Sequence, residues 1–183
     1  MSLMRPTHNI EKLIGVAGLS GSGKTTLTKA LSARLKVPYY AFGDFIRARA
    51  ASADLQTFGQ NYVTDRGASG FVEDFLAFYK VEAVSACMVE GIRHPDVWRE
   101  LVARSGASLL IFLAPPPSVI NRRLRERGGE SGRDPAAQLA HPVEEGVPDV
   151  QRLADLVLDE IRLDFVADLV LERVSTALGI TSK

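Results

Sequence analysis

The sequence predicts an α/β fold in which a parallel sheet of five strands lies between layers of helices. Short apolar runs alternate with longer stretches whose apolar residues recur at helical spacing. Runs that are apolar throughout are typical of strands buried on both faces, and alternation of strands with helices favours a parallel sheet. A glycine-rich turn joins the first apolar run to the first helical stretch. The length of 183 residues suits one domain, residues 1–183.

The first half of the chain contains three expected strands and three expected helices. The expected strands are residues 13–17, 37–41 and 87–89, each a short apolar run. The expected helices are residues 24–35, 44–53 and 71–83. The third helix is predicted by one apolar stripe, made of Phe71, Phe75, Phe78 and Val81.

The second half continues the same alternation. Helices are expected at residues 97–104, 118–127 and 161–178, and the middle one is strongly basic. Strands are expected at residues 108–113 and 154–158, of which the first is an unbroken apolar run. These five strands complete the predicted sheet.

Residues 128–148 interrupt this pattern. They contain several Gly and Pro, together with Arg133, Asp134 and His141, and show little periodicity. Because the segment is too short to be a domain, we predict a lid inserted into the single domain, with a plain loop as the alternative. His141 is expected to be an exposed loop histidine rather than an acid–base group.

Composition limits the possible partners. Lys plus Arg equals Asp plus Glu at 22 each, which argues against general nucleic-acid binding. The single cysteine, Cys87, excludes an internal disulfide and lacks the partners of a metal site. No apolar run is long enough for a membrane span, and no signal-peptide core is present. We therefore expect a cytoplasmic protein, a monomer or homodimer, without membrane or nucleic-acid partners.

The glycine-rich turn is the most specific motif in the chain. "GLSGSGKT" at residues 18–25 fits G-x-x-x-x-G-K-[ST], between an expected strand and an expected helix. Glycines let backbone N–H groups approach phosphate oxygens, and the helix N-terminus adds partial positive charge. Lys24 supplies a cation to the outer phosphates, and the Thr25 hydroxyl can bind Mg²⁺. The residues expected to bind the nucleoside triphosphate are Gly18, Ser20, Gly21, Ser22, Gly23, Lys24, Thr25 and Thr26.

This segment resembles the phosphate loop of P-loop nucleotide kinases, in which "GxSGSGKTT" leads straight into a helix. The resemblance extends over residues 13–178 and implies a three-layer P-loop NTPase fold with a short lid. It also implies ATP and Mg²⁺ as cofactors and nucleotides as substrates.

Two further motifs bear on the phosphoryl acceptor. "GDFIR" contains Asp44 and Arg47, and is similar to the "GDxxR" segment of adenylate and cytidylate kinases, whose Arg binds the acceptor monophosphate. "EGIR" contains Glu90 and Arg93, and resembles "DGIR" of a less characterised group related to adenylate and dephospho-CoA kinases. That resemblance implies that Glu90 holds Mg²⁺ through water or orients the acceptor, and that Arg93 binds acceptor phosphate. A capping Asp with a solvated Arg, and a surface Glu–Arg turn, are the structural alternatives.

The basic stretch "NRRLRERGGESGRD" is similar to the "RxxxR" pattern that enters the lid of nucleotide kinases. Arg123 and Arg127 are four residues apart and share one helix face, whereas Arg122 and Arg125 share another. We predict that Lys24, Arg93, Arg123 and Arg127 stabilise the charge of the transferred phosphoryl group. A solvated basic face is the alternative for any single arginine.

These motifs favour an ATP-dependent phosphotransferase that resembles a nucleoside monophosphate kinase. A dephospho-CoA kinase, in which Asp44 could serve as the base, is the first alternative. A nucleotide-dependent switch or ATPase is the second, although the N-K-x-D stretch of a GTP switch is absent. Small-molecule kinases of the shikimate or gluconate type are the third.

Overall fold

The computed structural model describes residues 9–50, 54–131, 140–159 and 163–180. Five strands form one sheet in the order β2-β3-β1-β4-β5, and each neighbouring pair is parallel. The strands are β1 Asn9–Gly18, β2 Tyr39–Ala41, β3 Ala83–Ile92, β4 Ser105–Leu113 and β5 Leu156–Leu158. The predicted five-stranded parallel sheet is therefore confirmed.

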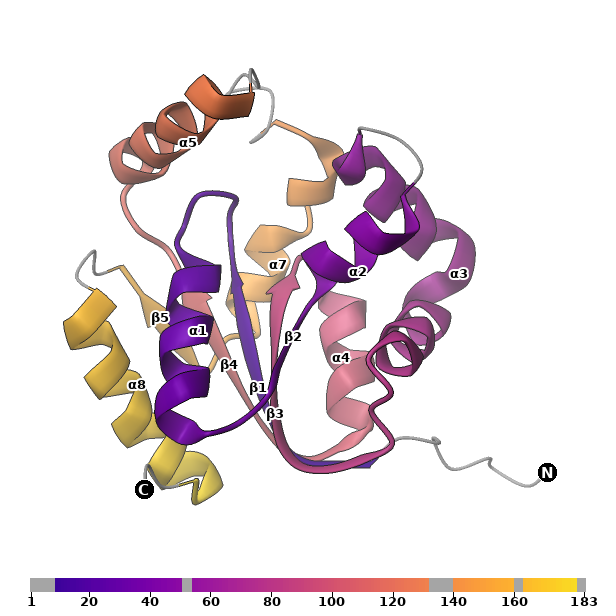
Figure 1. Cartoon of the computed structure of the whole chain (residues 1–183), viewed down its shortest axis with the longest axis vertical. Coiled ribbons are helices and arrows are strands. Elements are labelled where there is room, and N and C mark those ends of the chain that lie inside the picture. Colours follow the sequence, from indigo (N-terminus) through magenta and orange to yellow (C-terminus); the bar gives the residue numbers. More distant parts are fainter. Residues whose placement is uncertain (1–8, 51–53, 132–139, 160–162, 181–183) are drawn as a thin grey trace.

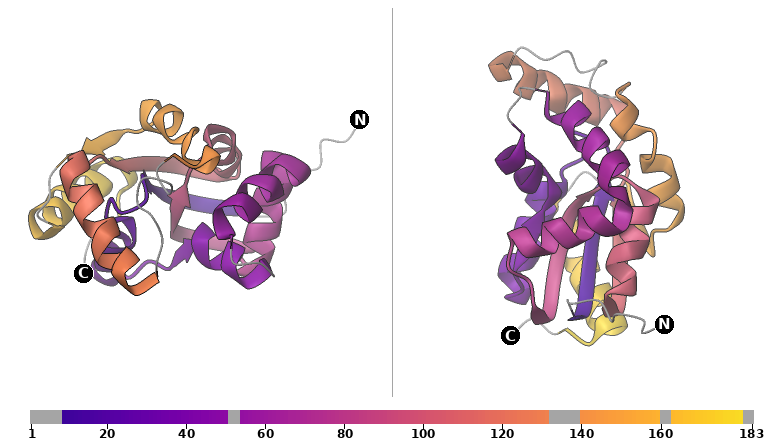
Figure 2. Two further views of the ribbon diagram at one scale, coloured as in Figure 1. Left: turned by 90° about the horizontal axis from the view of Figure 1, so that it is seen from above. Right: turned by 90° about the vertical axis from the view of Figure 1, so that its right-hand side faces the viewer.

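Helices cover both faces of this sheet, as Figures 1 and 2 show. The helices are α1 Lys24–Leu35, α2 Phe42–Arg49, α3 Leu55–Phe78, α4 Pro95–Ala103, α5 Pro117–Ser131, α7 Val147–Arg152 and α8 Leu163–Leu178, with a 3-10 turn η1 at Pro142–Glu144. One hydrophobic core joins α1 and α8 to the sheet. The other core lies between the opposite face and α2, α3, α4 and α7. Helix α5 lies across the end of the sheet where β1 and β3 finish (Figure 1).

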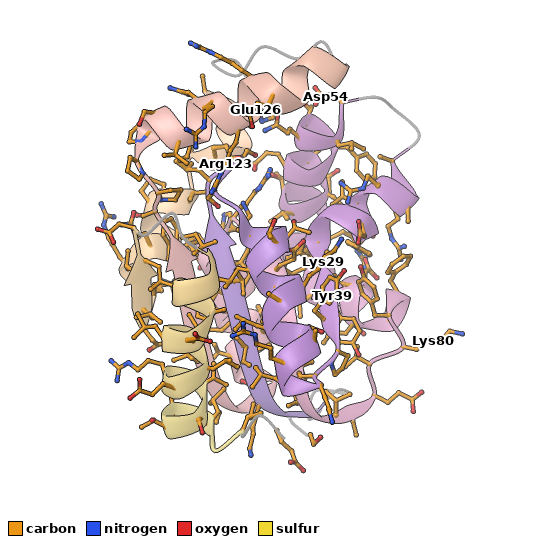
Figure 3. The ribbon with its side chains drawn as sticks, turned by 60° about the vertical axis from the view of Figure 1, so that its left-hand side comes forward. Lys29, Tyr39, Asp54, Lys80, Arg123 and Glu126 are labelled. Carbon is orange, nitrogen blue, oxygen red and sulfur yellow. The ribbon has the colours of Figure 1, made fainter. Side chains whose placement is uncertain are left out.

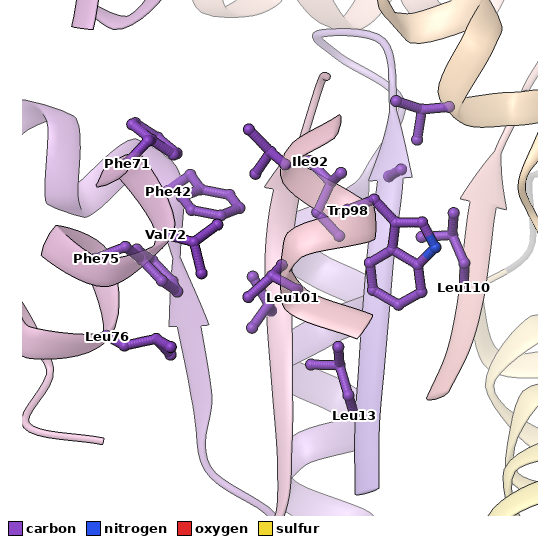
Figure 4. Close-up of a cluster of buried hydrophobic side chains, with 14 of the residues drawn as sticks. Leu13, Phe42, Phe71, Val72, Phe75, Leu76, Ile92, Trp98, Leu101 and Leu110 are labelled. Atoms are coloured by element: carbon purple, nitrogen blue, oxygen red, sulfur yellow. The ribbon is translucent and has the colours of Figure 1, made fainter. Parts of the chain in front are cut away.

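Alternation along β1 divides its side chains between the two cores. Leu13 and Ala17 pack on the side of α4, whereas Ile14 and Val16 pack on the side of α1. Gly15 lets α4 approach, because a Cβ there would lie 2.6 Å from the Trp98 ring. Figure 4 shows Trp98 beside this strand, near Ile92, Leu101 and Leu110 of the same hydrophobic core. The central strand is thus fixed on both faces, and its carboxyl end is held in place.

Helix α3 differs most from the prediction. The predicted helix 71–83 is wrong at both ends, because α3 begins at Leu55 and ends at Phe78. Its first half carries Gly59 and many polar residues, which weaken the apolar periodicity. The N-terminus is capped by the Asp54 carboxylate, which accepts from the backbone N–H of Thr57 at 3.1 Å. A backbone turn at Gly67, with φ 66° and ψ 165°, separates the two halves.

Regular structure occupies part of the expected lid, residues 128–148, whose role as a lid stays a prediction. Helix α5 continues to Ser131, and η1 and α7 occupy part of the remainder. Residues 132–139 lie outside the described structure. Within the described ranges, no helix is both long and apolar enough to cross a membrane.

Candidate active site

The phosphate loop, residues 18–25, connects the end of β1 to the start of α1. Gly18, Gly21 and Gly23 have positive φ angles of 140°, 81° and 102°. Only glycine adopts such angles without strain. A Cβ on Gly18 would also lie 2.5 Å from the carbonyl oxygen of Leu113 in β4. The glycine spacing therefore fixes a tight turn against the neighbouring strand.

Lys24 lies at the first position of α1 and folds back over the loop. Its Nζ donates to the carbonyl oxygens of Gly18 and Leu19, both at 2.8 Å. The first backbone N–H groups of α1 have no partner one turn earlier in the helix, so they face the loop with partial positive charge. The Lys24 cation and the N-terminus of α1 together form a site suited to phosphate oxygens.

Thr25 and Glu90 meet beside the loop. The Thr25 hydroxyl donates to Oε1 of Glu90 at 3.0 Å, and Glu90, in β3, is only 7% exposed. Its other oxygen, Oε2, is buried without a hydrogen-bond partner among the described residues. Hydroxyl and carboxylate oxygens are ligands that Mg²⁺ prefers. The described residues contain no group of three His, Cys, Asp or Glu suited to a metal, so an ion here would need phosphate oxygens as further ligands.

A cavity of about 500 Å³ adjoins the phosphate loop. Its floor includes Ser20, Lys24 and Thr25 of the loop and Glu90 and Arg93 at the end of β3. The opposite side, here called the acceptor wall, comes from α2 and the first half of α3; its lining residues are Phe42, Gly43, Ile46, Arg47, Leu55, Gln56, Gly59, Gln60 and Val63. Pro142, Glu145 and Gly146 close a further side. The cavity is therefore charged at its floor and partly apolar at its wall.

Arg47 lines the cavity from α2, and Asp44 pairs with it one turn earlier. The Arg47 guanidinium lies close to Gly43, since a Cβ added there would be 3.4 Å from Nη1 of Arg47. Both side chains are more than half exposed, so the pair is solvated and weak. Asp44 is not among the described lining residues of the cavity.

Arg93 belongs to a partly buried polar cluster that was not predicted from the sequence. Its Nη2 donates to the Ser20 hydroxyl at 3.1 Å and lies 3.4 Å from Oε1 of Glu144. Ser20 in turn donates to the same Glu144 oxygen at 2.9 Å. Glu144 is 4% exposed and lies in η1. The structure thus joins the phosphate loop, the end of β3 and η1 through three side chains.

The basic helix α5 approaches the phosphate loop through Arg123. Its Nη1 donates to the carbonyl oxygen of Ser22 at 2.8 Å and lies 3.5 Å from that of Gly21. Figure 3 shows Arg123 between α5 and the loop. Arg122 points to Glu126 on the exposed surface instead. The Arg127 side chain lies outside the described part of the structure.

His141 is half-buried rather than exposed, which corrects the expectation for it. Its Nε2 lies 3.1 Å from the Thr57 hydroxyl, beside the Asp54 cap of α3. The hydrogen bond from the Thr57 side chain lowers the pKa of Asp54, and the backbone bond adds to this effect. The contact between His141 and Thr57 connects the segment before η1 to the first half of α3, which forms part of the acceptor wall.

Two contributors to the site were not expected from the sequence, the first half of α3 and Glu144. Of residues 71–84, only Phe71 lines the cavity. Gly59 and Gly67 hid the helical pattern of residues 55–66. Glu144 stands in an irregular, acidic segment, and no signal in the sequence distinguishes it from Glu145.

Fold and site together define a P-loop kinase-like domain. Residues 14–144 match the protein family described as AAA domain, and the chain belongs to this family. A UPF0200 protein of Pyrobaculum aerophilum is 32% identical over 119 residues, which cover 63% of this chain and 66% of the relative. A cytidylate kinase of Pyrobaculum calidifontis is 30% identical over 121 residues, covering 65% and 62%. The chain thus spans slightly less than two thirds of the length of these curated relatives.

Solved structures show the same fold. Shikimate kinase from Aquifex aeolicus is similar with a TM-score of 0.59 and 20% identity, over 91% of this chain and 99% of that chain. A putative kinase from Chloroflexus aurantiacus gives a TM-score of 0.57 and 15% identity, over 91% and 97%. At these identities the likeness concerns the fold alone.

Proposed function

We propose that this protein transfers the γ-phosphoryl group of Mg-ATP to a nucleoside monophosphate. One observation supports this most strongly: a single cavity of about 500 Å³ is lined by Lys24 in the phosphate loop, by Arg47 on the acceptor wall and by Arg93 at the end of β3. A phosphotransferase needs a donor phosphate site and an acceptor phosphate site that share one space. A switch or simple ATPase has no need for a second cationic side chain, such as Arg47, on the acceptor wall.

The donor would bind to the phosphate loop. Backbone N–H groups of residues 18–26 would surround the phosphates of ATP, and Lys24 would leave its two carbonyl partners to reach the outer phosphates. Thr25 and Glu90 fit Mg²⁺ because a hydroxyl and a carboxylate oxygen without a described partner lie together beside the loop. The ion would supply charge neutralisation at the phosphate oxygens.

The acceptor would lie along the acceptor wall. Arg47 and Arg93 would bind its phosphate, for which a planar guanidinium is well shaped. Gln56 and Gln60 offer carboxamide groups for the polar edge of a base, between apolar side chains such as Phe42. Because two relatives are cytidylate kinases, CMP and dCMP are the first acceptors to test.

Charge that develops during transfer would be stabilised by Lys24, Arg93, Arg123 and Arg127. Arg123 already contacts the phosphate loop through the carbonyl oxygen of Ser22, so a small rotation would direct it at a bound phosphate. Dephospho-CoA is a poorer acceptor for this site, because its phosphorylation needs a carboxylate base. Asp44, the candidate base, is paired with Arg47 and is not among the described residues that line the cavity.

The test measures ADP formation from Mg-ATP with CMP, dCMP, AMP or dephospho-CoA, and without acceptor. We expect ADP only with a nucleoside monophosphate, and none after EDTA removes Mg²⁺. ADP with dephospho-CoA alone, or at the same rate without acceptor, would contradict the proposal. The Lys24→Ala variant serves as the inactive control.

A further inference from the structure

Glu144 is a charged side chain in a place where charge is costly. The residue is 4% exposed, and its side chain is 2% exposed. An ionised carboxylate removed from water destabilises a protein unless cations or hydrogen-bond donors surround it. The structure gives it both, since the Ser20 hydroxyl and the Arg93 guanidinium meet at Oε1.

Backbone packing brings the segment that carries Glu144 close to Arg93. Gly146 lies against the start of α4, where an added Cβ would be 2.6 Å from the carbonyl oxygen of Arg93. The backbone N–H of Glu144 donates to the carbonyl oxygen of His141 at 2.8 Å, which closes the turn η1. The first contact brings the backbone after η1 close to that of Arg93, and the second fixes the turn that carries Glu144, independently of the ion pair itself.

The position of Glu144 relative to the cavity indicates what the contact does. Ser20 and Arg93 line the cavity, whereas Glu144 is not among the described residues that line it. The carboxylate therefore lies behind the two polar side chains and does not occupy the space of a phosphate. This placement indicates that the Glu144 carboxylate orients Arg93 and does not compete with a bound anion for space in the cavity.

We propose that Glu144 is a positioning residue that holds the Arg93 guanidinium toward the acceptor phosphate; this inference rests on the proposed function. A free arginine side chain loses much rotamer entropy when it binds phosphate, and a buried carboxylate behind it removes part of that cost in advance. Oε2 of Glu144 is buried without a hydrogen-bond partner among the described residues. It can accept a second N–H if the guanidinium turns to bidentate pairing.

The decisive variant is Glu144→Gln, which keeps the shape and the acceptor for Ser20 but removes the charge that holds Arg93. We expect kcat/KM for the acceptor to fall about tenfold, as for the loss of a charged hydrogen bond. The KM for ATP should change less than about twofold, because the Ser20 contact persists. Asp149→Asn, five residues after Glu144, is the matched control, because it removes a carboxylate from an exposed pair with Arg152.

A mutant cycle with Arg93→Met separates positioning from a structural role. If Glu144 acts through Arg93, Glu144→Gln should cause no further loss in the Arg93→Met background. Equal losses in both backgrounds would overturn the proposal. Arg93→Met alone leaves the buried Glu144 charge unpaired; if that single variant folds poorly, the proton-exchange measurement in Glu144→Gln decides instead of the cycle.

A readout without substrates distinguishes this inference from the proposed function. In protein labelled with 15N-arginine, the signals of the Nη2 protons of Arg93, the group that meets Ser20 and Glu144, are assigned by their loss in Arg93→Met or in the double variant. We expect these protons to exchange with water faster in Glu144→Gln and at an unchanged rate in Asp149→Asn. An unchanged rate in Glu144→Gln would overturn the positioning role. Wild-type protein without acceptor-dependent ADP formation would instead overturn the proposed function, and the exchange rate would then decide the role of Glu144.

Discussion

The phosphate loop is one continuous segment of eight residues, 18–25, whereas the acceptor side of the cavity is assembled from distant parts of the chain. The loop takes its shape from its own glycines, which have positive φ at three positions. The other side combines α2, the first half of α3, the end of β3 and residues 142–146. Under the proposed function, donor binding would depend on local chemistry and acceptor binding on tertiary packing. Variants of the loop should therefore change stability or ATP binding, whereas variants of the acceptor wall should change the KM for the acceptor.

The largest expected effect is on the loop backbone. Gly18→Ala combines a left-handed φ with a Cβ 2.5 Å from the Leu113 carbonyl oxygen, so we expect a loss of about 4 kcal/mol in the free energy of unfolding. Gly67→Ala is the control, because its φ is also positive but no atom lies within 4 Å of the added Cβ. Gly67→Ala should lose about 2 kcal/mol in the free energy of unfolding. Urea unfolding measures both, and equal losses would show that β4 does not constrain the loop.

Removal of the loop cation comes next. Lys24→Ala should lower kcat about 100- to 1000-fold, because Lys24 would neutralise charge on the transferred phosphoryl group. ATP affinity should also fall, whereas the unfolding midpoint should stay close to that of the wild type. Steady-state kinetics and calorimetric titration of ATP measure these quantities. Unchanged turnover would show that the motif does not act as a donor site.

The acceptor wall should respond differently. Arg47→Ala should raise KM for the nucleoside monophosphate about 10- to 100-fold, the effect of one lost charge-assisted contact. The KM for ATP should stay within about twofold, because Arg47 lies on the opposite side of the cavity from the phosphate loop. Arg99→Ala, which removes an exposed arginine paired with Asp96, is the control. A parallel rise in both KM values for Arg47→Ala would contradict the division into two regions.

The smallest effect concerns Cys87, in the strand between the two regions. Burial raises the pKa of its thiol from 9.0 to about 12. Between these values the folded state retains a proton that the unfolded state loses, so the free energy of unfolding should fall as pH rises. Relative to Cys87→Ala, wild-type protein should lose about 1.4 kcal/mol between pH 8 and pH 10. Urea unfolding at both pH values measures this; a constant difference would mean that the thiol titrates normally.

Prediction from the sequence was correct for elements whose residue pattern lies within one short, continuous stretch of chain. The five strands and the phosphate loop were expected because an apolar run, or a glycine pattern, lies within a few neighbouring residues. Helix α3 was missed over residues 55–66, because Gly59, Gly67 and polar side chains weaken its periodicity. Packing of Phe58 and Tyr62 against the aromatic core, with the Asp54 cap, stabilises that half instead.

The sequence by itself determined the parallel α/β sheet and the phosphate-binding turn, because backbone sterics and apolar periodicity act over short stretches of chain. Tertiary structure alone decided that Glu144 contacts Ser20, 124 residues away, and that the first half of α3 faces the same cavity as Arg93. These contacts depend on how the segments pack around the sheet. A buried carboxylate becomes identifiable only when the fold shows which cations and donors surround it.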